Sequence, residues 1–407
     1  ESGVTQFGHA MDDWGHRFIN ENSIHIQQPV IPWRYINRNP YLPYRKVTAN
    51  ISDHQQLMFQ ITPAPYWRAE RTKQRNEVFR EQKLDRVEYA DDHFTGASGT
   101  TIYAADVFPE KYYGNIFVGD VAGSLVHRDV IDYNTDSVVF FARRDETEKD
   151  REFLASTDPW FRPVNFTAGP DGALYVIDIY RQHIEAPPFI PEELKKDMDF
   201  LNGNKMGRIY RIIPKNGGIY KKNPLNLKSA KTGELVDQLS NPNQWWRLQA
   251  QRLLLERQDM SAVPALKNML TQNKDPRARL HALYALEALN ALDASLVKQA
   301  MKDIHPGVRE SAIKLSEKYQ ECVPVLLELL HDSATRVALQ ATLSLGEFSA
   351  SPIVPALAGV MDKYGHNPWF RLAVLSSEHG SSLPLFEILI KKGFFSGETK
   401  PESTAFL

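Results

Sequence analysis

The hydrophobic pattern of the chain changes its period near residue 232. Up to about Pro214, short runs of aliphatic and aromatic residues alternate with glycine-containing turns, as in the runs 116–118 and 208–213. Short runs bounded by turn residues are typical of β-strands. From about Thr232, apolar residues recur three and four positions apart, which is the period of an amphipathic helix. The pattern predicts a mainly β N-terminal half followed by an all-α half.

One short phrase occurs three times in the β half. A glycine is followed three positions later by an aromatic residue, then by a β-branched residue and, two positions further, by an acid. The copies are Gly15–Glu21, Gly114–Asp120 and Gly172–Asp178. Each copy predicts a turn glycine, a short strand and a carboxylate at the end of that strand. Repeated turn-strand units are typical of β-propellers, so residues 1–214 are expected to form a partial β-propeller.

Three such units are fewer than the roughly four to eight blades that close a propeller. We therefore expect residues 1–214 to be the C-terminal blades of a larger ring, and the chain to be a piece of a longer protein. The stretch from Arg68 to Arg86 is highly charged and is expected to be an insertion between strands, either helical or exposed.

The helical half repeats as well, with a small residue about every 30 positions and an arginine before several of them. The small residues are Ala250, Ala282, Ala312, Ala341 and Ala373, and the arginines are Arg247, Arg279, Arg309 and Arg371. Short helix pairs bury their apolar faces by stacking on one another. We predict a HEAT-like α-solenoid of roughly five helix pairs over residues 235–395, preceded by a linker at 215–234 and followed by a tail at 396–407.

Composition and charge exclude several classes of function. The net charge of -2 gives no global field for nucleic acid, and no apolar run approaches the roughly 18 residues of a membrane span. The single cysteine, Cys322, excludes an internal disulfide. The chain has no phosphate loop, dinucleotide fingerprint or Gly-x-Ser-x-Gly elbow, and no Cys-x-x-Cys-His haem motif. Nucleotide-dependent chemistry, serine hydrolysis and a c-type haem on these residues are therefore not expected.

The candidate site residues lie at the ends of predicted strands. Glu21, Asp120 and Asp178 take the same place in three repeats, so they are expected to converge at a channel mouth as Ca²⁺ ligands or as a general base. The alternative is that each acid bonds a neighbouring turn, as aspartates after strands frequently do. Directly after Asp178 the chain presents Tyr180, Arg181 and His183 on a loop. Such loops carry function on rigid scaffolds, although a salt-bridged corner is equally compatible with these residue types.

The β half also holds several histidines: His9, His16, His25, His54, His93, His127 and His183. His25 and His127 follow repeat acids by four and seven residues, which suits a set that faces a channel. No pair shows the helical spacing of a compact metal site, so a surface or core position is the alternative for each of them.

Several segments resemble a known bacterial family. They are residues 153–164, 169–176, 180–181 and 207–211, together with 7–8, 12–18, 241–247 and 250–254. The chain is similar over nearly its whole length to planctomycete-type membrane-bound dehydrogenases. In these proteins a β-propeller, distantly similar to quinoprotein glucose and sorbosone dehydrogenases, precedes HEAT repeats and often a cytochrome tail. The resemblance implies pyrroloquinoline quinone, Ca²⁺ and oxidation of a sugar or alcohol in the periplasm or at the cell surface.

This resemblance assigns roles to the candidate residues. Glu21, Asp120 and Asp178 would hold the cation, and Tyr180 and Arg181 would hold the quinone or substrate. His127 or His183 would be the base, and Asp178 and Asp120 would help to bind the cation or would accept a proton. The solenoid would bind an electron-accepting cytochrome or another protein through its concave side. Two alternatives stay open, namely a non-catalytic protein that binds a glycan or a protein, and a carbohydrate lyase or hydrolase that uses the paired acids.

Overall fold

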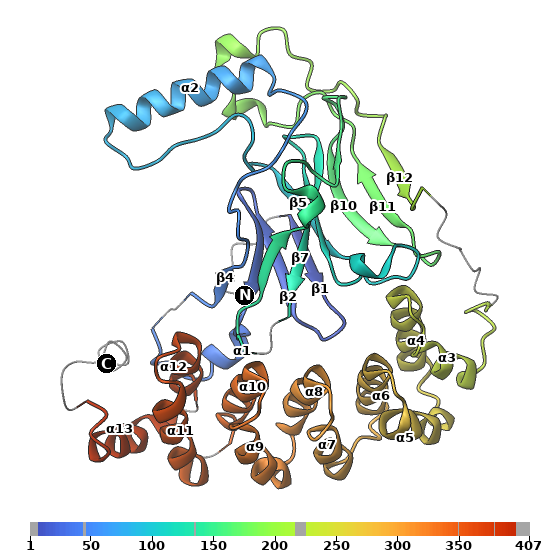
Figure 1. The fold of residues 1–407 in the computed structure, drawn as a ribbon, viewed down its shortest axis with the longest axis vertical. Helices are drawn as coiled ribbons and strands as arrows, with labels where there is room; N and C mark the ends of the chain where they lie inside the picture. Colours follow the sequence, from blue (N-terminus) through green and yellow to red (C-terminus); the bar gives the residue numbers. More distant parts are fainter. Residues whose placement is uncertain are drawn as a thin grey trace.

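The computed structural model describes residues 7–43, 46–133, 136–215, 225–348, 350–377 and 379–395. A β region, residues 7–215, stands on a row of helices that begins at Thr232 (Figure 1). Part of the predicted linker, at 216–224, and the predicted tail at 396–407 lie outside the described residues. The division into a mainly β half and a helical half is confirmed.

The β region consists of three antiparallel sheets, in which the paired strands follow chain order. The first sheet contains β1 (Gly8–Met11), β2 (Arg17–Glu21), β3 (Ile24–Pro29) and β4 (Thr48–Asn50). The second contains β5 (Ala97–Ile102), β6 (Ile116–Asp120), β7 (Leu125–Asp132) and β8 (Phe141–Arg144), with β9 (Leu154–Ala155) paired to β7. The third contains β10 (Pro163–Ala168), β11 (Leu174–Asp178) and β12 (Arg208–Ile212).

The first strands of the sheets pack together, with β5 in contact with both β1 and β10. Within the described residues no sheet closes on itself, so the sheets form an open array and the predicted propeller stays a prediction. Each copy of the repeated phrase forms the second strand of its sheet, namely β2, β6 or β11. Gly15, Gly114 and Gly172 have φ angles of +81°, +79° and +74°, a conformation that favours glycine. The predicted turn glycine, strand and terminal acid are therefore present in all three copies.

The charged stretch near Arg68 forms helix α2 (Tyr66–Glu81), which lies between β4 and β5 in the sequence. Figure 1 shows this helix at the end of the β region that is farthest from the solenoid, beside a green segment around residues 185–205. Arg71 of α2 forms an ion pair with Glu185 of that segment. Short helical turns complete the region: α1 (Trp33–Ile36), η1 (Glu110–Tyr112), η2 (Glu146–Glu148), η3 (Pro187–Phe189) and η4 (Glu192–Leu194).

The helical half stacks in pairs as predicted. Its helices are α3 (Thr232–Gln238), α4 (Gln244–Arg257), α5 (Val263–Gln272), α6 (Pro276–Ala288), α7 (Ala294–Ala300), α8 (Pro306–Ser316), α9 (Val323–Leu329), α10 (Thr335–Leu345), α11 (Ala350–Tyr364), α12 (Pro368–Leu375) and α13 (Ser382–Lys391), with the short turns η5 (Met260–Ala262), η6 (Gln320–Cys322) and η7 (His379–Ser381). The five repeated alanines are fully buried, and the helices that carry them pack against one another along the row. None of the described helices combines the length and the apolar character that a membrane span needs.

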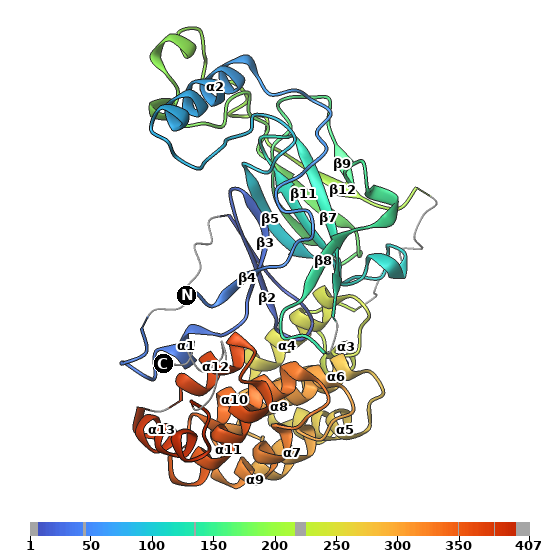
Figure 2. The same cartoon turned by 60° about the vertical axis from the view of Figure 1, so that its left-hand side comes forward.

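The β region rests on one side of the solenoid. Figures 1 and 2 show α4, α6, α8 and α10 on the side nearest the sheets, with α5, α7 and α9 on the far side. His16 Nε2 lies 3.0 Å from Glu310 Oε2 of α8, and the Tyr35 hydroxyl donates to Glu317 over 2.6 Å. Asp13 forms a buried ion pair with Arg247 of α4. Polar residues of the two halves thus pair across this side of the solenoid. The side that was expected to bind a partner protein is therefore in contact with the β region of the same chain.

Candidate metal centre

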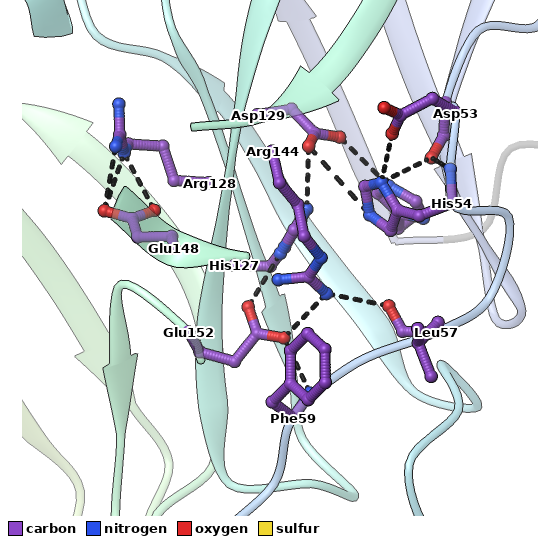
Figure 3. Close-up of polar contacts among 12 residues, drawn as sticks. Asp53, His54, Leu57, Phe59, His127, Arg128, Asp129, Arg144, Glu148 and Glu152 are labelled. Atoms are coloured by element: carbon purple, nitrogen blue, oxygen red, sulfur yellow. Dashed lines mark hydrogen bonds and ion pairs between the residues drawn. The ribbon is translucent and has the colours of Figure 1, made fainter. Parts of the chain in front are cut away.

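Three imidazoles and one carboxylate meet inside the β region. They belong to His25 on β3, His54 in the loop after β4, and His127 and Asp129 on β7. One ligand atom from each residue lies within 4.8 Å of the others. Figure 3 shows Asp129 directed toward the side chains of His54 and His127 between the strands. The cluster therefore joins the first sheet to the second.

Strand geometry explains how β7 supplies two of these side chains. His127 and Asp129 are two residues apart, so they project from the same face of the strand. The loop that carries His54 is fixed by a bridge between Ser52 and Ala142, the second residue of β8. The Asp53 amide also donates to the Ala142 carbonyl over 3.0 Å. The four side chains are thus positioned by paired backbone rather than by free loops.

The ligand atoms lie close together, but few of them form hydrogen bonds with one another. Asp129 Oδ1 lies 3.0 Å from His127 Nε2 and 3.9 Å from His54 Nε2. Within the described part of the chain, none of these three buried atoms has a hydrogen-bond partner of good geometry. His25 Nε2 does bond Asp129 Oδ2, at 3.1 Å. Buried polar atoms are almost always bonded, so three atoms that meet at one point without a well-aligned hydrogen bond are candidate metal ligands.

Carboxylates hold two of the imidazoles through Nδ1, the ring nitrogen that faces away from the site. His127 Nδ1 lies 2.7 Å from Glu152 Oε2, and His54 Nδ1 lies 2.7 Å from Asp53 Oδ1. Glu152 in turn accepts from Arg144 at 2.9 Å and from the Phe59 amide at 2.8 Å. Histidines that bind metals commonly donate their second nitrogen to a carboxylate in this way. This arrangement leaves Nε2 of His127 and His54 as the inward-facing nitrogen.

Burial and charge give the four groups different proton affinities. Burial alone would lower the pKa of His127, but Asp129 and Glu152 outweigh it and raise that pKa to about 9. Burial lowers the pKa of His54 to about 4 and also lowers the pKa of His25. Burial opposes ionisation of Asp129, yet His127 and His25 hold its pKa well below the usual range. At neutral pH, Asp129 is therefore ionised and His127 carries an additional proton. A bound cation would displace that proton.

The donor set discriminates among cations. Three imidazoles and a carboxylate suit Zn²⁺ and neighbouring first-row transition metals. Ca²⁺ prefers six to eight oxygen ligands, so the predicted Ca²⁺ does not fit this cluster.

The structure does not bring the three predicted acids together. Among the residues that it describes, one group of three or more metal-binding side chains is gathered closely enough, and Glu21, Asp120 and Asp178 are not in it. Asp120 instead accepts four backbone amides, from Thr95, Gly96, Ala122 and Gly123. Asp178 Oδ1 accepts two, from Arg162 at 2.8 Å and Tyr180 at 2.7 Å. Both aspartates thus bond turns, which is the alternative considered above.

The remaining predicted residues separate into two places. His127 belongs to the candidate metal site, whereas Asp178, Arg181 and His183 line a cavity of about 660 Å³ beside the third sheet. The Tyr180 ring lies under the Arg208 guanidinium, with 3.6 Å between its centroid and Cζ. The sequence patterns do not identify His25, His54 or Asp129 as ligands. The sequence feature that could have indicated a site is the spacing of His127 and Asp129, which lie two residues apart on one strand.

The comparisons with known families agree with this division of the chain. Residues 1–216 match the family described as a domain of unknown function, DUF7133, and residues 233–316 match HEAT repeats. Since the first match spans more than half of the chain, the protein belongs to the DUF7133 family. The predicted HEAT solenoid is confirmed. No curated protein matches the chain, and the predicted dehydrogenase activity, pyrroloquinoline quinone and periplasmic location stay predictions.

Proposed function

We propose that the β region is a metal-binding domain that holds one transition-metal ion, Zn²⁺ in the first instance, through His25, His54, His127 and Asp129. The observation that supports this proposal is the group of closely spaced ligand atoms that two sheets bring to one point, three of which lack a well-aligned hydrogen bond within the described residues. Four protein ligands complete a tetrahedral shell, which is typical of structural zinc sites. The ion would tie β3 and the loop after β4 to β7.

Metal analysis of the purified protein tests the proposal. We expect about one zinc per chain after loading and desalting, and a lower melting temperature after chelation. Replacement by Co²⁺ should give the intense visible absorption of a tetrahedral site with nitrogen ligands. The variants His25→Gln and Asp129→Asn should each lose most of the bound metal.

His9→Gln is the matched control, because His9 lies exposed on β1 and is not part of the cluster. This variant should keep the full metal content. Equal metal content in His9→Gln and His25→Gln would contradict the proposal, as would a wild-type protein that takes up no zinc, cobalt, iron or manganese.

A further inference from the structure

A cavity of about 720 Å³ lies between the β region and the solenoid and contains none of the four candidate metal ligands. The hairpin of β1 and β2 and the segment from Gln28 to Tyr35 form one wall, and helices α4, α6, α8 and α10 form the other. Figure 1 shows these helices on the side of the solenoid that faces the sheets. Small-molecule sites commonly occupy cavities of roughly 300–1,000 Å³ where two domains meet. The size and the place of this cavity therefore fit a ligand site.

The lining exposes apolar side chains from three different elements. Met11 on β1 is 47% exposed, Trp33 on α1 is 37% exposed and Leu248 on α4 is 48% exposed. Trp14 and Tyr284 add two partly buried rings to the same lining. A ligand that covers such side chains removes apolar surface from water, which favours binding. The cavity therefore suits a ligand with an apolar body.

The acids of the lining are held inside the protein. The side chains of Asp12, Asp13 and Glu310 are between 3% and 6% exposed. Asp12 and Glu310 contact the two ring nitrogens of His16, and Asp13 pairs with Arg247. These negative charges are therefore balanced within the chain and are not presented to a ligand.

The charged side chains of the lining that remain accessible are cations. Arg17, Arg34 and Lys314 each keep part of their surface exposed. Arg34 pairs with Glu317 over 2.7 Å, so its charge is balanced outside the lining. Lys314 lies one turn after Glu310 on α8, but that carboxylate contacts the β region, and the Lys314 side chain has no hydrogen bond or ion pair within the described residues. An ammonium group beside apolar surface favours a ligand that carries a carboxylate.

The amide side chains of the lining are already bonded, which disfavours a sugar. Each of them forms a hydrogen bond with another residue of the chain. They are Gln28, Gln244, Gln251 and Gln340. A polyhydroxylated ligand depends on such groups as donors and acceptors. The lining therefore favours an apolar anion over a glycan.

We propose that this cavity binds an amphiphilic carboxylate, a medium-chain fatty acid in the first instance. The carboxylate would bond Lys314, and the apolar chain would lie against Met11, Trp33 and Leu248. Because the walls belong to the β region and to the solenoid, the bound molecule would contact both halves of the protein.

Calorimetric titration of the full chain with octanoate tests this proposal. We expect saturable binding of one octanoate per chain. Octan-1-ol lacks the charge and octylamine reverses it, so each should bind at least about tenfold more weakly, since a hydrogen bond to a charged group contributes about that factor. No saturable binding of octanoate would overturn the proposal. Binding of octan-1-ol or octylamine that equals or exceeds that of octanoate would overturn it as well.

Two variants test the polar and the apolar contact separately. Lys314→Gln should weaken octanoate binding about tenfold and leave octan-1-ol binding unchanged, because it removes only the cation. Leu248→Gln should weaken both ligands at least about threefold, because it removes apolar contact. Lys302→Gln and Leu255→Gln are the matched controls, since both residues are exposed and lie outside the cavity lining. Equal losses in the controls and in the cavity variants would contradict the assignment.

Discussion

The solenoid and the β region both repeat, but their repeated residues behave differently. In the solenoid, Arg247, Arg279, Arg309 and Arg371 each donate through Nη1 to the carbonyls five and six positions earlier. In the β region, the repeated acids Asp120 and Asp178 also bond turns, yet Asp178 Oδ2 has no hydrogen bond within the described residues. A repeated residue that makes the same hydrogen bonds in every copy has a structural role, whereas a copy that departs from the pattern is a candidate for a further role.

The ion pairs of the repeated arginines show the same contrast where the two halves meet. Arg279 pairs with Asp303 and Arg309 pairs with Asp332, in both cases within the solenoid. Arg247, at the start of the row, pairs instead with Asp13 of the β region. The solenoid thus uses its own repeated arginine to hold the β region.

The Arg247 pair is expected to give the largest effect. Both side chains are almost fully buried, so Arg247→Met leaves the Asp13 charge uncompensated. We expect a loss of about 3–5 kcal/mol in the free energy of unfolding, measured by urea titration followed by circular dichroism. The double variant Asp13→Asn with Arg247→Met should recover part of this loss, because no unpaired charge is left. A single variant within about 1 kcal/mol of the wild type would show that the pair does not join the two halves.

His16 should make the contact between the two halves depend on pH. Its Nδ1 lies 2.8 Å from Asp12 Oδ2, and its Nε2 lies 3.0 Å from Glu310 Oε2. Burial alone would lower the pKa of His16, but Asp12 and Glu310 raise it from 6.5 to about 9. The folded state therefore holds this proton more tightly, and the resulting stability is complete below pH 6.5 and is lost as the pH rises through 9.

The difference between wild type and His16→Gln isolates this contribution. Wild type should lose at most about 3 kcal/mol more than the variant between pH 6 and pH 10, because one pKa unit corresponds to about 1.4 kcal/mol. Groups that titrate in both proteins cancel in this comparison. Parallel stability curves for the two proteins over this range would refute the role of His16.

Local patterns predicted the helices and strands but not the candidate metal site. The repeated alanines, the turn glycines and the strands of the repeated phrase each depend on neighbours within a few residues, so period and turn chemistry identify them. His25, His54 and Asp129 come from three segments separated by up to 104 positions. Their meeting depends on how β3 and β7 pack, which no spacing along the chain records. The pairing of the solenoid with the β region likewise depends on the complementarity of two folded surfaces.

The smallest losses of stability are expected when the three repeat glycines are replaced by alanine. These variants test whether the three copies of the phrase are equivalent. All three have positive φ, so alanine should cost about 1 kcal/mol at Gly15 and Gly114, where the added Cβ meets nothing closer than 3.9 Å. At Gly172 the Cβ would lie 2.6 Å from Val107 Cγ2, which adds a packing clash. Gly172→Ala should therefore lose about 1 kcal/mol more than the other two variants, measured by thermal unfolding. Equal losses at all three glycines would mean that Val107 moves aside, and that the third copy differs from the others at Asp178 but not at its turn.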